Sequence, residues 1–183
     1  MKHTLHFFFI LSFVASTFIS CSSTDKEKLV TIQNKYTLSV PSILIESKDL
    51  NDEASLQYEN QIKELYVMVI DEPKDELHKA ITENSMQDTY SPDLTGYTNL
   101  VLPDFIKSVP GAKPSDIKDT LINNMPAKVL TLKGVVNNIE VFYYIAIVEG
   151  KKEYYQVLSW TTAKQEKQYA DIMKRTVLSL REL

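Results

Sequence analysis

The segment from Ile139 to Val148 constrains the fold of this chain more than any other. Its ten residues include one charged side chain, Glu140, and the others are aliphatic or aromatic. Successive side chains of a β-strand point to opposite faces, so a strand with this sequence is apolar on both faces. Such a strand needs cover on both sides, and the sequence therefore predicts that it lies in the interior of a sheet.

Turn signals stand on both sides of this segment. Asn137–Asn138 precedes it, and asparagine tolerates the positive φ that a two-residue hairpin turn requires. Gly150–Lys151 follows it and predicts a second turn. We therefore expect neighbouring antiparallel strands at Ala127–Val136, with Gly134 as a bulge, and at Glu153–Thr161.

A helix is predicted after the last of these strands. Thr162 and Gln165 have the spacing of a capping box, in which two side chains bond reciprocally to the first turn of a helix. Apolar residues then recur at helical spacing, at Tyr169, Ile172, Met173, Val177 and Leu180. Long hairpins closed by a helix predict an α+β fold, with a mostly antiparallel central sheet flanked by helices.

The N-terminal half predicts further strands and two helices. The expected strands are a hairpin of Leu29–Ile32 and Tyr36–Val40 that ends at Pro41, a half-buried strand around Leu56 and Tyr58, a central strand at Leu65–Ile70, and a strand at Ile117–Ile122. The expected helices are Pro73–Ile81 and a second that Asp93 caps and that runs toward Val109. Pro103 is expected to kink or restart this second helix.

Three of these segments resemble PsbP-like and DcrB-like domains. Tyr36–Pro41 is similar to their opening strand followed by proline, and Asn123–Val129 resembles the beginning of their third long strand. Gly150–Tyr155 and the helix after it are similar to their closing hairpin, tyrosine-rich strand and C-terminal helix. The resemblance spans most of residues 29–183 and implies an α/β/α sandwich. It also implies a non-catalytic binding or assembly factor, as most members of this class are.

Cys21 is the one cysteine of the chain, and it ends an apolar N-terminal segment. Lys2 is followed by the apolar run Phe7–Ile19, and no acidic residue occurs before Asp25. Phe18-Ile19-Ser20-Cys21 resembles the lipobox of bacterial lipoproteins, which implies cleavage before Cys21 and acylation of that residue. The alternatives are an uncleaved membrane anchor and an ordinary secretory signal that ends at a cysteine.

These features divide the chain into a signal peptide (1–20), a lipidated tether (21–28) and a single domain (29–183). Without Lys2 the remaining chain carries 19 Lys and Arg against 24 acidic residues, a formal charge of −5. An acidic surface does not favour nucleic acid or anionic lipid, so the lipid itself is expected to hold the protein on the membrane. Ser22 after the cysteine indicates the outer membrane, on its periplasmic side.

Few residues beyond the leader have the chemistry of a catalytic or metal site. His78 is the one histidine outside the leader, and we expect it on the solvated surface of a charged helix. The acidic residues Asp71, Glu72, Asp75 and Glu76 could bind Ca²⁺, but they lack the spacing of a calcium loop. Compensation of a helix dipole accounts for them better. The sequence predicts no cofactor, no metal and no catalytic residue.

Aromatic residues gather on the last strands. Tyr154 and Trp160 share one face of their strand, whereas Tyr155 points to the other. Tyr154 and Trp160 are candidate ligand-binding residues of an aromatic groove. The alternative, which we favour, is that they pack the sheet against a helix.

Three functions remain open from the sequence. The first, which we prefer, is a membrane-anchored, non-enzymatic binding or assembly module with a partner in the envelope. The second is a small-molecule carrier with an aromatic groove around Trp160, which an open apolar pocket would favour. The third is an envelope enzyme that uses carboxylates and tyrosines such as Asp71, Glu72 and Tyr66, which a buried carboxylate pair in a cleft would favour.

Overall fold

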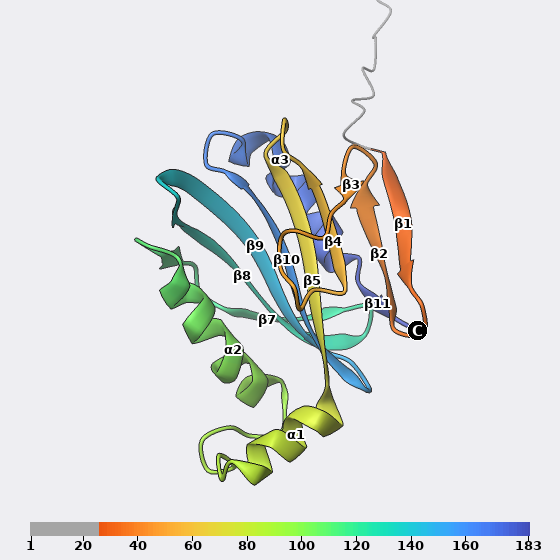
Figure 1. Ribbon diagram of the computed structural model, residues 1–183, viewed down its shortest axis with the longest axis vertical. Helices are drawn as coiled ribbons and strands as arrows, with labels where there is room; N and C mark the ends of the chain where they lie inside the picture. Colours follow the sequence, from red (N-terminus) through yellow and green to blue (C-terminus); the bar gives the residue numbers. More distant parts are fainter. Residues whose placement is uncertain (1–25) are drawn as a thin grey trace, which may run out of the picture.

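The computed structural model describes residues 26–183 and shows an α+β fold of two antiparallel sheets with helices on both faces of the larger one (Figure 1). The predicted signal peptide, Cys21 and most of the predicted tether lie outside these residues. Within the described range, no helix is long and apolar enough to cross a bilayer.

The large sheet has the strand order β3-β4-β5-β10-β9-β8-β6, and β7 pairs with β8 beside this path. Every neighbouring pair is antiparallel. Its strands are β3 (Ile45–Glu46), β4 (Leu56–Asn60), β5 (Leu65–Pro73), β6 (Lys113–Pro114), β7 (Lys118–Ile122), β8 (Met125–Val136), β9 (Ile139–Glu149) and β10 (Glu153–Thr162).

Strand β9 lies between β8 and β10, so the predicted interior position of Ile139–Val148 is confirmed. Asn137 and Asn138 form the turn before it with φ of 50° and 66°, the left-handed conformation that asparagine tolerates. Most of β9 is buried from Val141 onward, because helices and the small sheet cover its two faces.

The prediction of a bulge at Gly134 is wrong. The register between β8 and β9 runs without interruption from Ala127↔Val148 to Val136↔Ile139, and Gly134 pairs with Val141 in step. A Cβ on Gly134 would overlap the Val109 side chain. The absence of a side chain at Gly134 therefore allows the segment after α2 to approach the strand closely. This close approach accounts for the glycine without a bulge.

The small sheet has the order β1-β2-β11, with β1 (Glu27–Ile32), β2 (Tyr36–Pro41) and β11 (Arg181–Glu182). The predicted N-terminal hairpin is confirmed, but β1 begins at Glu27, two residues before the expected start. Glu27 pairs with Pro41 at one end of the hairpin, whereas β11 pairs with Tyr36 and Thr37 at the other. The beginning of the described chain and the C-terminal strand thus lie at opposite ends of this sheet.

The helices α1 (Lys74–Glu83) and α2 (Leu94–Ser108) lie together on one side of the large sheet, and α3 (Glu166–Leu178) packs on the other (Figure 1). Asp93 caps α2 as predicted, because its side chain accepts a hydrogen bond from Gly96 N at 2.8 Å. The helix continues through Pro103, so no restart occurs there.

The capping box predicted for α3 does not form. Gln165 is the N-cap residue and makes no side-chain capping bond. The Thr162 hydroxyl donates instead to Glu64 at the end of the β4–β5 turn, at 2.8 Å. This contact is between residues far apart in the chain, so the local pattern could not reveal it.

Two hydrophobic cores lie on the two faces of the large sheet. One is closed by α1 and α2 and contains Tyr154, and the other is closed by α3 and the small sheet and contains Tyr155. Trp160 packs at the edge of the first core. The predicted division of faces along β10 is therefore confirmed.

Candidate functional site

Tyr154, one of the two predicted ligand residues, is fully buried beneath α1 and α2. Its ring stacks on Tyr97 with 4.4 Å between centroids, and the Lys74 ammonium lies 4.9 Å from its centroid. Burial, together with the nearby charge of Glu149, raises the pKa of Tyr154 to about 12. Its ring already has partners on the faces that a ligand would use, and ligand binding by Tyr154 stays a prediction.

Trp160, the other predicted ligand residue, is half-buried on the same face. It stands in a row of rings across three strands, between Tyr66 at 5.1 Å and Tyr143 at 5.9 Å. The planes of Trp160 and Tyr66 differ by 8°, so the rings stack on each other. A tyrosine ring thus stacks against the indole from each of the two neighbouring strands. Ligand binding by Trp160 also stays a prediction, and stacking of a flat ligand on it would require the row to open.

His78, which we expected on the solvated surface of α1, is less exposed than that expectation implies. The side chain is half-buried, and its Nε2 lies 3.4 Å from the Tyr154 hydroxyl. The two rings meet edge to face at 6.1 Å. His78 lies on the turn of α1 that faces the sheet, next to the buried Leu77, which the charged neighbours in the sequence concealed.

The residues suggested for an enzyme do not come together. Asp71 points to the α3 side of β5, whereas Tyr66 and Glu72, at even positions, point to the α1 and α2 side. Asp75 and Glu76 lie in the first turn of α1, where they favour the helix dipole. Among residues 26–183, no three His, Cys, Asp or Glu side chains are close enough to hold a metal ion together.

A carboxylate pair that the sequence did not indicate lies where β5 and β10 meet the β1–β2 turn. Lys35 donates a hydrogen bond to Asp71, whose side chain is only 2% exposed. Asp71 Oδ1 and Glu153 Oε2 are buried without a hydrogen-bond partner among the described residues. The space between Glu153 and Lys35 is about 40 Å³, which is room for water rather than for an organic molecule.

Burial raises the pKa of the Glu153 carboxyl above its ordinary value, and the charge of Asp71 adds to this. The Lys35 ammonium acts in the opposite direction on Glu153. The hydrogen bond to Asp71 in turn raises the pKa of Lys35. In this pair, Lys35 neutralises the Asp71 carboxylate, whereas the surroundings of Glu153 favour the protonated form of its carboxyl.

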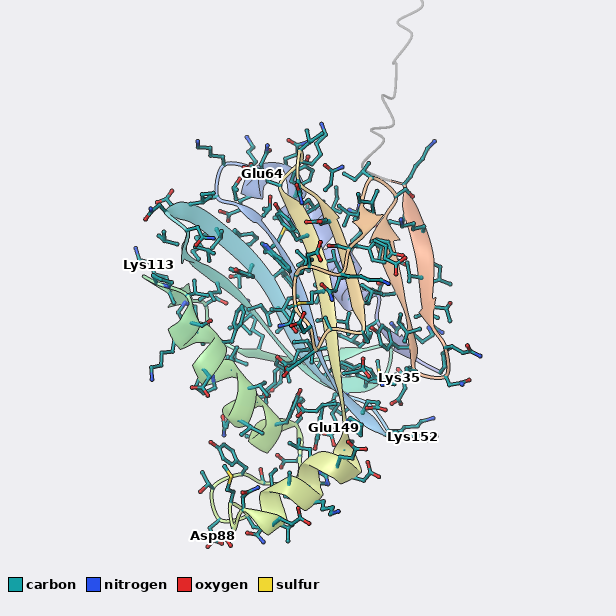
Figure 2. All side chains as sticks on the ribbon, in the orientation of Figure 1. Lys35, Glu64, Asp88, Lys113, Glu149 and Lys152 are labelled. Carbon is teal, nitrogen blue, oxygen red and sulfur yellow. The ribbon has the colours of Figure 1, made fainter. Side chains whose placement is uncertain are left out.

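A larger hollow of about 580 Å³ opens beside this pair, at the end of the sheet where Figure 2 labels Glu149 and Lys152. Three separate pieces of chain form it: the β7–β8 turn, the β9–β10 hairpin and the C-terminal strand. Its lining residues are Asn123, Asn124, Met125, Pro126, Glu149, Gly150, Lys151, Arg181, Glu182 and Leu183.

Glu182 fixes the shape of this hollow. Its carboxylate accepts hydrogen bonds from the backbone N–H groups of Lys151 and Lys152 at 2.8 and 3.2 Å, and from the Tyr155 hydroxyl at 3.2 Å. A Cβ on Gly150 would overlap this carboxylate, so the glycine is required for the contact. The C-terminal strand is thereby held against the β9–β10 hairpin.

The charges in the hollow are unequally satisfied. Glu149 accepts hydrogen bonds from Lys74 Nζ at 2.6 Å and from Leu94 N at 3.2 Å. Glu182 accepts the hydrogen bonds from the β9–β10 hairpin given above. Arg181 makes one long bond, at 3.3 Å, to the neutral side chain of Asn123. The Lys151 ammonium has no partner among the described residues. The lining therefore presents two cationic side chains, Lys151 and Arg181, that form no ion pair within residues 26–183, whereas its acidic side chains already accept hydrogen bonds.

No protein-family model matches the chain, and no curated protein matches it in sequence. Solved structures do match it. The cyanobacterial PsbP protein (CyanoP) of Synechocystis sp. PCC 6803 has a TM-score of 0.55 at 9% identity, with 86% of this chain and 92% of that chain covered.

Two further structures are similar. LpqN of Mycobacterium tuberculosis, which is involved in cell envelope biogenesis, has a TM-score of 0.55 at 13% identity, over 86% of this chain and 90% of that one. PA94 of Pseudomonas aeruginosa, a protein of unknown function, has a TM-score of 0.50 at 13% identity, over 85% and 96%. At these identities the likeness shows the fold, which is PsbP-like.

Proposed function

We propose that this protein is a non-enzymatic binding module of the cell envelope, held by acyl chains on Cys21 and engaging a partner through the hollow at its C-terminal strand. The observation that carries the proposal is the Lys151 ammonium, which has no partner in the part of the chain that the structure describes, in a hollow of about 580 Å³. Hollows of roughly 300–1,000 Å³ are the usual size of a ligand site. The likeness in fold to LpqN supports an envelope location, for which we propose the periplasmic side of the outer membrane.

The chemistry of the lining favours a partner with an acidic group. Both carboxylates in the hollow already accept hydrogen bonds from the protein, whereas Lys151 and Arg181 retain positive charge. A carboxylate or phosphate on the partner would form charge-assisted hydrogen bonds with these two side chains.

The enzyme and the carrier have weaker support. The Asp71 and Glu153 pair is the buried carboxylate pair that an enzyme would need, but the adjoining space of about 40 Å³ is too small for an organic substrate. The aromatic row around Trp160 is closed by its own stacking, which leaves little for a carrier to use.

Site-specific photo-crosslinking in the native envelope tests the proposal. A photo-reactive residue replaces Leu183, which lines the hollow and is exposed, and a control carries it at the exposed Ile139 on the far end of β9. We expect one reproducible crosslinked product from position 183 and not from 139, and its loss when Lys151→Glu is added. Identical products from both positions, or a product insensitive to Lys151→Glu, would contradict this function.

A further inference from the structure

Two isoleucines are strongly exposed at the end of the molecule where β1 begins. Ile62 stands at the tip of the β4–β5 turn and is 91% exposed, and Ile45 on β3 is 69% exposed. Figure 1 shows the β4–β5 turn and the start of β1 at the same end. A single exposed apolar side chain is ordinary on a protein surface, so what matters here is where these two side chains lie relative to the start of the described chain.

Printed contacts join these isoleucines to the start of the described chain. Ser42 N donates to Lys26 O at 2.8 Å, and Lys28 Nζ donates to Leu44 O at 2.8 Å, which fixes the segment before β3 against β1. Ile45 then pairs with Glu59 on β4, the strand that leads into the turn carrying Ile62. The segment that carries Ile45 is thus joined directly to β1, and Ile62 follows on the turn at the end of β4.

The position of Lys26 indicates what covers the end of the fold that carries Ile45 and Ile62. Cys21 precedes it by five residues, which reach about 17 Å when fully extended. We infer that Ile45 and Ile62 dock this end of the domain onto the lipid surface itself. The inference rests on the lipid anchor proposed above and adds an orientation to it.

Charge does not drive this contact. Exposed Lys26 and Lys63 are accompanied at the same end by Glu27, Glu46 and Glu59, so no net positive patch faces the lipid headgroups. The amine of Lys28 is also occupied, by Leu44 O and by the Tyr58 ring at 4.5 Å. The contact is therefore apolar insertion of two side chains, and it persists at high salt.

Fluorescence quenching on vesicles tests the orientation with a matched control. The acylated protein carries Gln61→Cys, next to Ile62, or Thr120→Cys, next to Leu121, which is 66% exposed on β7. With the Cys21 sulfur acylated, the introduced thiol is the only one that takes a bimane label. The vesicles contain phosphatidylethanolamine and phosphatidylglycerol, with brominated acyl chains as quenchers.

We expect a blue shift and loss of emission at position 61, unchanged by 0.5 M salt, and neither change at position 120. Adding Ile45→Asn and Ile62→Asn should abolish the quenching at position 61 while the protein still sediments with the vesicles. Sedimentation with equal quenching at both positions, or with none at 61, overturns the orientation and leaves the anchor intact. A blue shift without quenching by the lipid means that a second copy of the protein covers this end, which also overturns the orientation. Failure of the acylated protein to sediment removes the anchor and the orientation together.

Discussion

The buried surroundings of Glu153 oppose the ionisation of its carboxyl. Its Oε2 is buried without a hydrogen-bond partner within residues 26–183 and lies near Asp71, whose own charge is already matched by Lys35. An acid whose pKa rises on folding binds its proton more tightly in the folded state, so it stabilises the fold at low pH. That contribution is complete below the unfolded-state pKa and is lost as the pH rises through the folded-state value.

Glu153→Gln should therefore raise the free energy of unfolding at neutral pH, because it removes an ionisation that the fold disfavours. The advantage over the wild type should be absent below pH 4.5, the ordinary value of this carboxyl, and should grow above it. Urea unfolding at pH 3.5, 5 and 7 measures the difference. An advantage that shrinks as the pH rises would contradict the assigned direction.

At the scale of elements, β9 contributes side chains to both hydrophobic cores, one from each of its faces. Ile145, on the α1 and α2 side, is 1% exposed, whereas Ile139 at the start of the same strand is 51% exposed. A charge at position 145 would be buried without a partner, whereas a charge at position 139 would stay in water.

Ile145→Asp should lower the free energy of unfolding by about 4 kcal/mol or more, since it places an unpaired carboxylate in the core. Ile139→Asp, the same substitution on the same strand, should change it by about 0.5 kcal/mol or less. Denaturant titration of the two variants compares them. Similar losses would mean that β9 is not interior along its length.

The sequence was a good guide to β8, β9, β10 and α3, because long apolar runs and the two asparagines of a hairpin turn are local signals. It gave no sign of β3, β6 or β11, since strands of two residues have no periodicity. It also misjudged Thr162, whose hydroxyl bonds to Glu64 across the fold. The hollow escaped notice for the same reason: Asn123, Lys151 and Arg181 come from three distant segments and share no motif.

For the whole molecule, the two ends of the fold differ in character. Ile45 and Ile62 lie exposed at the end where β1 begins, and the hollow, which exposed Leu183 helps to line, lies at the other end, where β11 meets the β9–β10 hairpin. β2 separates them by about 17 Å along its length. With the first end on a membrane, the hollow would face away from it, toward a partner.

The anchor itself is tested by Cys21→Ala. Metabolic labelling with a fatty-acid probe should tag the wild type and leave this variant unlabelled, because the predicted acylation site is gone. The variant should also leave the membrane fraction, since acyl chains contribute about 0.8 kcal/mol per buried CH₂ to retention. Equal labelling of both proteins would rule out lipidation at this residue.

The pairing of β11 with β2 has a consequence for how the chain reaches its fold. Arg181 pairs with Thr37, and just beside this pair Ser39 N donates a hydrogen bond to Ser179 Oγ across a sequence separation of 140 residues. Contacts of such separation close large loops and slow the folding of a domain. The N-terminal hairpin is nearest to the proposed anchor. Its sheet therefore cannot be completed until nearly all of the described chain is available to fold. Until then β2 presents an unpaired edge, the kind of surface on which a strand of another chain can pair.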